Sequence, residues 1–315
     1  MILRHFLADD DISQAEQVQI LDLADDLKDQ PFKYPVFAGP RSVAMLFDKP
    51  TLRTQSSFAA GIAELGGFPM IIDTRLAGIG ERESIADTAR VLGRQAAAII
   101  WRTYGQERLE EMARCAGVPV INALTDSYHP CQILADLLTI REHKGRLAGL
   151  TLAYVGDGAN NIAHSYALGG GLAGLHVRIG APNGYQLDPV IRARADATAQ
   201  ASGGSLTVTS SPAEAVAGAD VVATDTWVSM GQEDRIDRQR ILAPYALTAE
   251  LLGQAASEAI VLHCLPAYRG KEIAAEVIDG PQSVVWDEAE NRRHAQKALL
   301  VFLDGQATAE GLVGA

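Results

Sequence analysis

The sequence predicts an α/β protein of two domains, each a parallel sheet with helices on both faces, and a ligand cleft between the domains. Three observations lead to this prediction. Short apolar runs alternate with segments of helical periodicity. Nine such runs are more than one open sheet usually contains, which favours two sheets. Polar clusters follow most of the runs. The predicted strands are 42–47, 68–73, 96–101, 118–124, 150–156, 175–181, 205–209, 220–225 and 259–265.

The domain junction is predicted where a helix ends and the fifth strand begins. The helix that follows His129 and Pro130 ends at Lys144, so the domains are expected to span 1–144 and 145–288. A last helix at about 289–304 is expected to pack back on the first domain. Ser13 and Glu16 have the spacing of a capping box that opens the first helix.

Composition and charge narrow the class of protein. The chain has 27 basic and 39 acidic residues, and this net charge of -12 argues against non-specific nucleic-acid binding. The start lacks the apolar core of a signal peptide, and no window approaches the roughly 18 apolar residues of a membrane span. Three widely spaced cysteines indicate thiols in a reducing compartment, so we expect a soluble cytoplasmic protein.

The loop after the first strand has the character of an anion site. Thr51, Arg53 and Thr54 precede an amphipathic helix, whose positive N-terminus and an arginine fork suit phosphate oxygens. Simple capping of that helix by one of the threonines explains the hydroxyls equally well.

Two further polar clusters follow the third and fourth strands. Arg102 ends an otherwise apolar strand, where a surface salt bridge is the ordinary explanation. His129 and Gln132 flank the first turn of a helix and present a ring and an amide near one face. A histidine that caps or packs under the helix is an equally ordinary explanation.

In the second half, GDGANN (156–161) resembles a dinucleotide fingerprint only in part. Asn161 stands in place of its third glycine, and the next strand ends without the acidic residue that holds a ribose. A nicotinamide enzyme is therefore a weak alternative, and the asparagines suit a carboxylate near a helix start. Asp225 in DTWVSMG suits a substrate ammonium group, or forms an ordinary Asx turn.

Adjacent His263 and Cys264 raise the question of a nucleophilic pair. Neighbouring residues on a strand point to opposite faces, so these two cannot form a dyad, and Cys264 is expected to line the cleft. No His/Cys cluster has the sequence spacing of zinc ligands, so no metal is predicted.

In combination these motifs resemble the ornithine carbamoyltransferase branch of the aspartate/ornithine carbamoyltransferase family, from about residue 4 to residue 304. The motifs are FDKPTLRT, WRT, HPCQ, GDGANN, DTWVSMG, HCLPAYRG and DEAENRRHAQKALL. The resemblance implies transfer of a carbamoyl group from carbamoyl phosphate to L-ornithine in arginine biosynthesis. It also implies a homotrimer with sites at subunit interfaces, and neither cofactor nor metal.

The resemblance also implies a role for individual residues. Arg53, Arg102, His129 and Cys264 would be catalytic. Carbamoyl phosphate would be bound by Thr51, Leu52, Arg53, Thr54, Arg102, His129, Gln132, Cys264, Leu265 and Arg292. Ornithine would be bound by Asn161, Asp225, Ser229 and Met230.

Three positions depart from the family pattern, all at the phosphate end of the implied pocket. Leu52 replaces a hydroxyl, Gln55 replaces an arginine, and Gly78 stands where relatives present a larger polar side chain. The departures lead to two hypotheses: a loosened phosphate site, as in an inhibitor-resistant variant, or another amine acceptor such as lysine, putrescine or an acylated ornithine. A binding paralogue without turnover remains a further alternative, disfavoured by the intact set of chemical groups.

Overall fold

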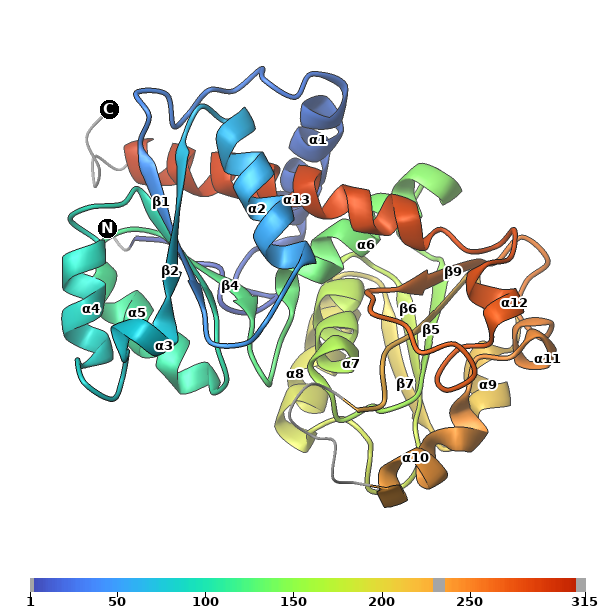
Figure 1. Ribbon diagram of the computed structural model, residues 1–315. Helices are drawn as coiled ribbons and strands as arrows, with labels where there is room; N and C mark the ends of the chain where they lie inside the picture. The colour runs from blue at the N-terminus through green and yellow to red at the C-terminus, as the bar shows by residue number, and fades with distance from the viewer. Residues whose placement is uncertain (1–2, 229–235, 310–315) are drawn as a thin grey trace. The chain divides into compact units, whose positions relative to one another are not determined.

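The computed structural model describes residues 3–228 and 236–309 (Figure 1). The chain divides into two compact units: unit 1 runs to Ala135 and resumes at Glu290, and unit 2 runs from Asp136 to Ala289. The chain passes from one unit to the other within two helices, α6 (Pro130–Lys144) and α13 (Val285–Ala309). The junction predicted at 144/145 lies at the end of α6, and α13 starts at 285 rather than 289.

Unit 1 contains a four-stranded parallel sheet with the order β2-β1-β3-β4. Its strands are β1 (Ser42–Phe47), β2 (Phe68–Asp73), β3 (Ala98–Arg102) and β4 (Val120–Leu124). All four were predicted: β1 and β2 with these bounds, β3 with both ends shifted by one or two residues, and β4 with a start two residues early. The apolar runs of β1, β3 and β4 are continuous because helices cover both faces of the sheet.

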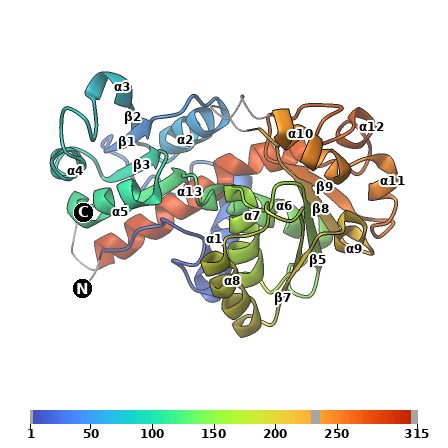
Figure 2. The ribbon, with the colours of Figure 1, turned by 90° about the horizontal axis from the view of Figure 1, so that it is seen from below.

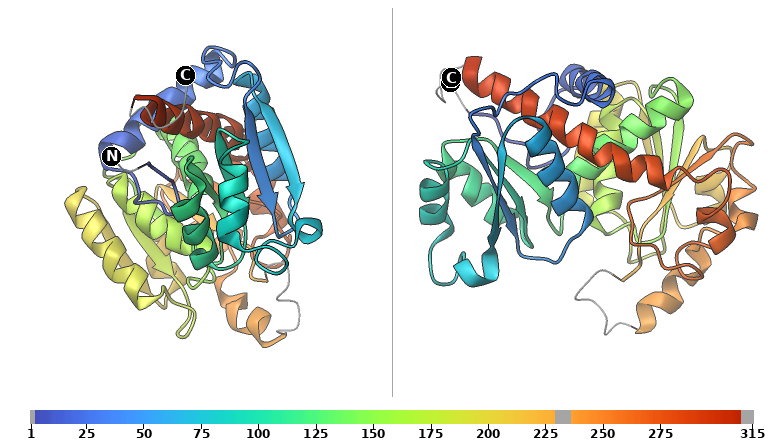
Figure 3. Two further views of the ribbon diagram at one scale, coloured as in Figure 1. Left: turned by 90° about the vertical axis from the view of Figure 1, so that its left-hand side faces the viewer. Right: turned by 45° about the horizontal axis from the view of Figure 1, so that its top comes forward.

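The helices of unit 1 lie on both faces of this sheet (Figures 1 and 3). They are α1 (Gln14–Asp29), α2 (Arg53–Glu64), α3 (Thr74–Ala77), α4 (Ile85–Leu92) and α5 (Gln106–Ala116), together with the unit 1 part of α13. On one face Leu46 and Trp101 pack against α4 and α5 through residues such as Leu109. On the other face α2 meets α13 closely, since a Cβ at Gly61 would lie 2.9 Å from Lys297.

The first helix begins where the sequence predicts. The Ser13 hydroxyl accepts a hydrogen bond from the Glu16 backbone N–H, and the Glu16 carboxylate accepts one from the Ser13 N–H at 2.8 Å. This reciprocal pair satisfies two backbone donors that a helix otherwise leaves unbonded, so the capping box is confirmed.

Unit 2 contains a five-stranded parallel sheet with the order β7-β6-β5-β8-β9. Its strands are β5 (Thr151–Val155), β6 (His176–Gly180), β7 (Ser205–Thr209), β8 (Val221–Thr224) and β9 (Ile260–His263). Each corresponds to a predicted strand, shortened by one or two residues at most ends. The two-sheet α/β fold is therefore confirmed.

Helices also cover both faces of the unit 2 sheet (Figure 2). The remaining elements are α7 (Asn161–Ser165), the π-helical turn η1 (Tyr166–Gly170), α8 (Pro189–Ala201), α9 (Pro212–Val216), α10 (Ile236–Leu242), the 3₁₀ turn η2 (Ala243–Tyr245), α11 (Ala249–Leu252) and α12 (Ala275–Ile278). Helices α9, α11 and α12 pack with β5, β8 and β9 in one apolar cluster. Helix α7, η1 and α8 lie on the opposite face (Figure 2).

In each sheet the carboxyl ends of the strands share one edge because all pairings are parallel. Ligands of open α/β sheets gather beyond that edge. The polar segments after β1, β3 and β4 therefore belong to one edge of unit 1, and those after β5, β8 and β9 to one edge of unit 2. In the described part of the chain no helix has both the length and the apolar character needed to cross a membrane.

Candidate active site

The loop after β1 leads directly into the start of α2. The residue at the N-cap position is Leu52, and no side chain caps the helix. Thr51 is half-buried in the turn, Thr54 is buried, and Leu52 is 75% exposed. The explanation that a threonine caps this helix is therefore wrong. A helix start without a side-chain cap keeps its N–H groups and its positive dipole end for an anion.

Arg102 joins this helix start to the end of β3. Its Nη1 donates a hydrogen bond to the Thr54 hydroxyl at 3.4 Å. Arg102 is the last residue of β3 and Arg53 the first of α2. Two arginines and a hydroxyl-bearing residue thus lie at one edge of unit 1.

His129 lies among cations at the start of α6. The side chain is buried, and burial lowers the pKa of its imidazole well below the ordinary value. The positive charges of Arg292, Arg102 and Arg53, in that order, lower the pKa further. Near neutral pH the ring is therefore uncharged, and a neutral imidazole donates a hydrogen bond without adding charge.

Gln132 and Arg292 form a buried pair beside this histidine. The Arg292 Nη1 donates to the Gln132 Oε1 at 2.6 Å, which brings α13 and the first turn of α6 together. A carboxamide oxygen has two lone pairs, so Gln132 can accept from a substrate N–H as well. Unit 1 thus presents three arginines, a neutral histidine and an amide from four different elements.

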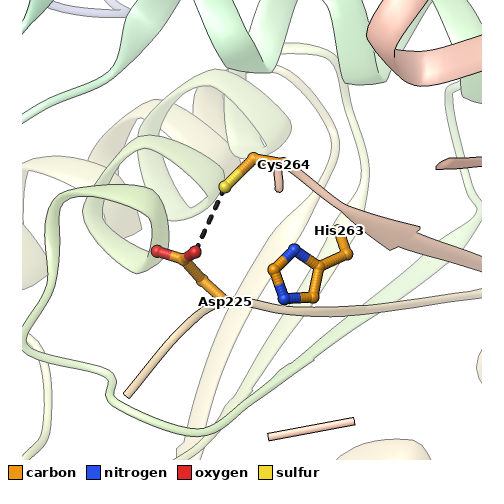
Figure 4. A group of neighbouring side chains, drawn as sticks. All are labelled: Asp225, His263 and Cys264. Carbon is orange, nitrogen blue, oxygen red and sulfur yellow. Dashed lines mark hydrogen bonds between the residues drawn. The ribbon is translucent and has the colours of Figure 1, made fainter. Parts of the chain in front are cut away.

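Unit 2 presents a carboxylate in place of cations. Asp225 follows β8 and is buried, and its Oδ1 accepts hydrogen bonds from the Thr226 N–H at 2.7 Å and the Cys264 thiol at 3.2 Å (Figure 4). Its Oδ2 accepts from the Asn160 amide at 3.3 Å. Burial raises the pKa of Asp225, and the neighbouring His263 lowers it. An ordered, buried carboxylate of this kind suits a substrate ammonium group.

The Cys264 thiol is protonated. Burial, followed by the charges of Asp225 and Glu288, raises its pKa well above the ordinary value. A thiol donor to Asp225 is therefore the state the surroundings favour, and a thiolate nucleophile is not.

His263 orients the segment that follows β9. Its Nδ1 accepts from the Leu265 N–H at 2.9 Å, so the ring proton is assigned to Nε2, which lies 3.3 Å from the Glu272 Oε1. Leu265 has a φ of 57°, a left-handed conformation that is rare for leucine. The ring and the buried Glu272 therefore support an unusual backbone turn at Leu265, which the resemblance implies in carbamoyl-phosphate binding.

Asp225, His263 and Cys264 also bring together three atoms of metal-ligand type, all within 4.8 Å of one another (Figure 4). Their spacing along the chain concealed this grouping, because the residues come from the ends of β8 and β9. In the structure the thiol donates to Asp225, and both imidazole nitrogens have protein partners. A cation would have to displace these hydrogen bonds.

The resemblance named Asn161 for ornithine binding, but in the structure the side-chain amide hydrogen bond to Asp225 comes from Asn160. Asn161 is the first residue of α7 and half-buried, but its neighbour Asn160 caps α7 and donates to Asp225. The N-cap position of a helix was the signal available for Asn160. Ser229 and Met230 lie outside the described residues.

Fold and side chains together define a two-domain α/β protein, with three arginines near a helix start in one domain and a buried carboxylate in the other. Two family models match the chain. Residues 4–142 match the carbamoyl-phosphate-binding domain of aspartate/ornithine carbamoyltransferases, and residues 148–303 match the Asp/Orn-binding domain. The chain belongs to the aspartate/ornithine carbamoyltransferase family.

Individual relatives cover nearly the whole chain. It is 61% identical over 305 residues to the ornithine carbamoyltransferase of Renibacterium salmoninarum, with 95% of this chain and 98% of that protein covered. It is 60% identical over 301 residues to that of Clavibacter sepedonicus, with the same coverage. Among solved structures, ornithine carbamoyltransferase from Pyrococcus furiosus is 41% identical, with a TM-score of 0.92 over 96% of this chain and 98% of that one.

Proposed function

We propose that this protein transfers the carbamoyl group of carbamoyl phosphate to the δ-amine of L-ornithine, giving L-citrulline and phosphate. The observation that carries the proposal is the near full-length similarity to curated ornithine carbamoyltransferases. The two groups of side chains support it, because one suits a phosphorylated donor and the other an amino-acid acceptor.

The donor binds in unit 1. The N-terminus of α2, with Arg53 and Thr54, holds the phosphate, and Arg292 contributes further positive charge. Arg102 and neutral His129 donate to the carbonyl oxygen. Negative charge grows on that oxygen during attack, so fixed donors there lower the barrier more than they stabilise bound substrate.

The acceptor binds in unit 2. Asp225 holds the α-ammonium group of ornithine, and Asn161 holds its α-carboxylate near the start of α7. An acylated α-nitrogen carries no positive charge, so it cannot pair with the buried Asp225 carboxylate. Asp225 therefore favours free ornithine over acetylornithine. Ser229 and Met230, which follow Asp225 in the same motif, complete the implied set.

The reaction needs a neutral δ-amine. Its pKa in solution is about 10.4, like that of lysine, so the group loses a proton before its lone pair attacks the carbonyl carbon. The carbon–oxygen bond to phosphate then breaks, phosphate leaves with the bonding electrons, and the attacking nitrogen passes its extra proton to the departing phosphate. Cys264 lies beside Asp225 as a protonated thiol, so it lines the path of the amine without forming a covalent intermediate.

The phosphate end of the pocket differs from relatives at Leu52, Gln55 and Gly78. Leu52 offers an exposed apolar side chain at the helix start, where a hydroxyl would donate to an anion. Gly78 has a φ of +65°, and a Cβ there would lie 2.9 Å from Arg82 side-chain carbons. We propose that these residues loosen phosphate binding and raise the KM for carbamoyl phosphate.

A panel of amines tests the acceptor. Purified protein is supplied with carbamoyl phosphate and, in separate reactions, ornithine, acetylornithine, lysine or putrescine, and the ureido product is measured at several carbamoyl-phosphate concentrations. Acetylornithine is expected to react at least 100-fold more slowly than ornithine, because its acylated α-nitrogen leaves the buried charge of Asp225 unpaired. Lysine, which is one methylene longer, and putrescine, which lacks the α-carboxylate, are also expected to react more slowly. A faster reaction with another amine would replace ornithine as the acceptor.

We also propose a cytoplasmic homotrimer with sites at the subunit interfaces. The edge strand β2 exposes Phe68 and Ile71, and the following helix α3 exposes Leu76 at 81%. Exposed apolar residues beside an unpaired strand edge favour self-association. Sedimentation equilibrium should give three times the 33.5 kDa chain mass. A monomer at micromolar concentration would contradict this assembly.

A further inference from the structure

A buried chain of hydrogen bonds in unit 1 runs through Gln296, a residue that the reaction scheme above does not use. Gln296 lies one helical turn after Arg292 on α13, and both side chains are buried. Its carboxamide lies between Arg292 and Ser57, and Ser57 is on α2 one turn after Arg53 and Thr54.

The donors and acceptors of these hydrogen bonds can be assigned one consistent direction, in which the Ser57 hydroxyl donates to the Thr54 carbonyl rather than to the Gln296 Oε1, which lies 3.2 Å away. The Arg292 Nη2 donates to the Gln296 Oε1 at 3.1 Å, and the Gln296 Nε2 donates to the Ser57 Oγ at 2.8 Å. The Ser57 hydroxyl can then donate to the Thr54 carbonyl at 3.3 Å. Each donor and acceptor is then used once. This series of hydrogen bonds ends at Thr54, whose hydroxyl accepts a hydrogen bond from Arg102.

At its other end the same guanidinium holds Gln132. The Arg292 Nη1–Gln132 contact is 2.6 Å, so Nη1 and Nη2 are fixed by amide oxygens from two helices. The position of a guanidinium is set by its hydrogen-bond partners, because its long side chain has many rotamers. Gln296 therefore ties the first turn of α2 to the orientation of Arg292.

We infer that Gln296 is a positioning residue for carbamoyl phosphate: its amide holds Arg292 and the phosphate-binding start of α2 in register. This inference rests on the proposed carbamoyl transfer. The amide serves both neighbours, and a carboxylate can also accept from both Arg292 and the Ser57 hydroxyl, whereas a thioether offers neither a donor nor a strong acceptor. Gln296 acts through Arg292 and α2 and does not touch the reacting atoms.

Steady-state kinetics of three variants test the inference. Gln296→Met keeps the length of the side chain and removes both hydrogen bonds, so the KM for carbamoyl phosphate is expected to rise about tenfold. The KM for ornithine is expected to stay within twofold, because that substrate binds in unit 2. Gln296→Glu keeps an acceptor for Arg292, and the Ser57 hydroxyl can donate to the new carboxylate. The KM for carbamoyl phosphate should therefore stay close to that of the unmodified protein. Ser57→Ala should raise the same KM about threefold.

A matched control separates positioning from lost stability. Ser13→Ala removes the cap of α1 and lowers the melting temperature without touching this chain, so both KM values should be unchanged. The double variant Ser57→Ala/Gln296→Met should be no worse than Gln296→Met alone, because both changes break one chain.

The outcomes also distinguish this inference from the proposed function. If the unmodified protein makes no citrulline, the proposed function fails. If it makes citrulline, but Gln296→Met saturates normally with carbamoyl phosphate or raises both KM values equally, the positioning role of Gln296 is wrong. If Gln296→Met does not fold, the same comparison of the two KM values in Ser57→Ala decides whether the positioning role is right.

Discussion

Replacing Asp225 by asparagine should remove the recognition of the acceptor while leaving the fold intact. The Asp225 carboxylate accepts hydrogen bonds from Thr226, Cys264 and Asn160. In the least disruptive orientation, the new NH2 group replaces Oδ2 and faces the donor amide of Asn160. The variant then loses the negative charge, at an expected cost of about 3 kcal/mol in binding the ammonium group. It also gains one donor–donor conflict with Asn160, which lowers the stability of the fold.

This cost corresponds to about a 150-fold fall in kcat/KM for ornithine, measured from initial rates of citrulline formation. The KM for carbamoyl phosphate should change less than threefold, since its binding groups lie in unit 1. Stability should change by less than about 1 kcal/mol, because the donor–donor conflict is offset when the charge, whose burial raises the pKa of Asp225, is no longer buried.

Asp188→Asn is the matched control for this change. Asp188 caps α8 through the Val190 and Ile191 N–H groups, and asparagine caps a helix as well as aspartate. The control should keep both KM values. A value of kcat/KM for ornithine within threefold of normal in Asp225→Asn would refute ammonium recognition by this carboxylate.

Three further predictions follow from other parts of the molecule. His129→Gln should lower kcat by about 10²–10³, because a donor to the developing oxyanion is displaced; single-turnover rates within fivefold of normal would contradict this role. Leu52→Ser should lower the KM for carbamoyl phosphate severalfold by restoring a hydroxyl at the start of α2, and an unchanged KM would separate the loop from phosphate binding. Burial lowers the pKa of His294 from 6.5 to about 3. Between these two pH values the unfolded chain binds a proton that the folded chain does not, so the stability present above pH 6.5 is lost as the pH falls. His294→Gln should therefore reduce the destabilisation between pH 7 and pH 5 by about 2 kcal/mol in urea unfolding, and equal pH dependence in both proteins would contradict a buried neutral ring.

The fold could be predicted from local patterns because those patterns reflect burial directly. β1, for example, is a continuous apolar run, and both of its faces are covered in the structure. The Ser13–Glu16 cap depends on residues three apart, so its geometry is fixed by the helix itself. The predicted ends of β3 and β4 were less accurate, since the apolar runs extend beyond the hydrogen-bonded ladder.

The site could be predicted less fully, because its geometry depends on contacts distant along the chain. The resemblance singled out Asp225 and Arg292, but not Asn160 or Gln296, which orient them. Asn160 is 65 residues from Asp225, and Gln296 is 239 residues from Ser57. Such partners follow from tertiary packing, and neither spacing nor periodicity indicates which amide meets which charged group.

The proposed transfer of the carbamoyl group to ornithine is tested most directly by following the carbamoyl carbon. Carbamoyl phosphate labelled with ¹³C is incubated with ornithine and the purified protein, and the products are quantified by NMR together with released phosphate. The account predicts that the label appears in the ureido group of citrulline, with one phosphate released for each citrulline formed. Phosphate released without labelled citrulline, or a label that enters no amine product, would contradict it.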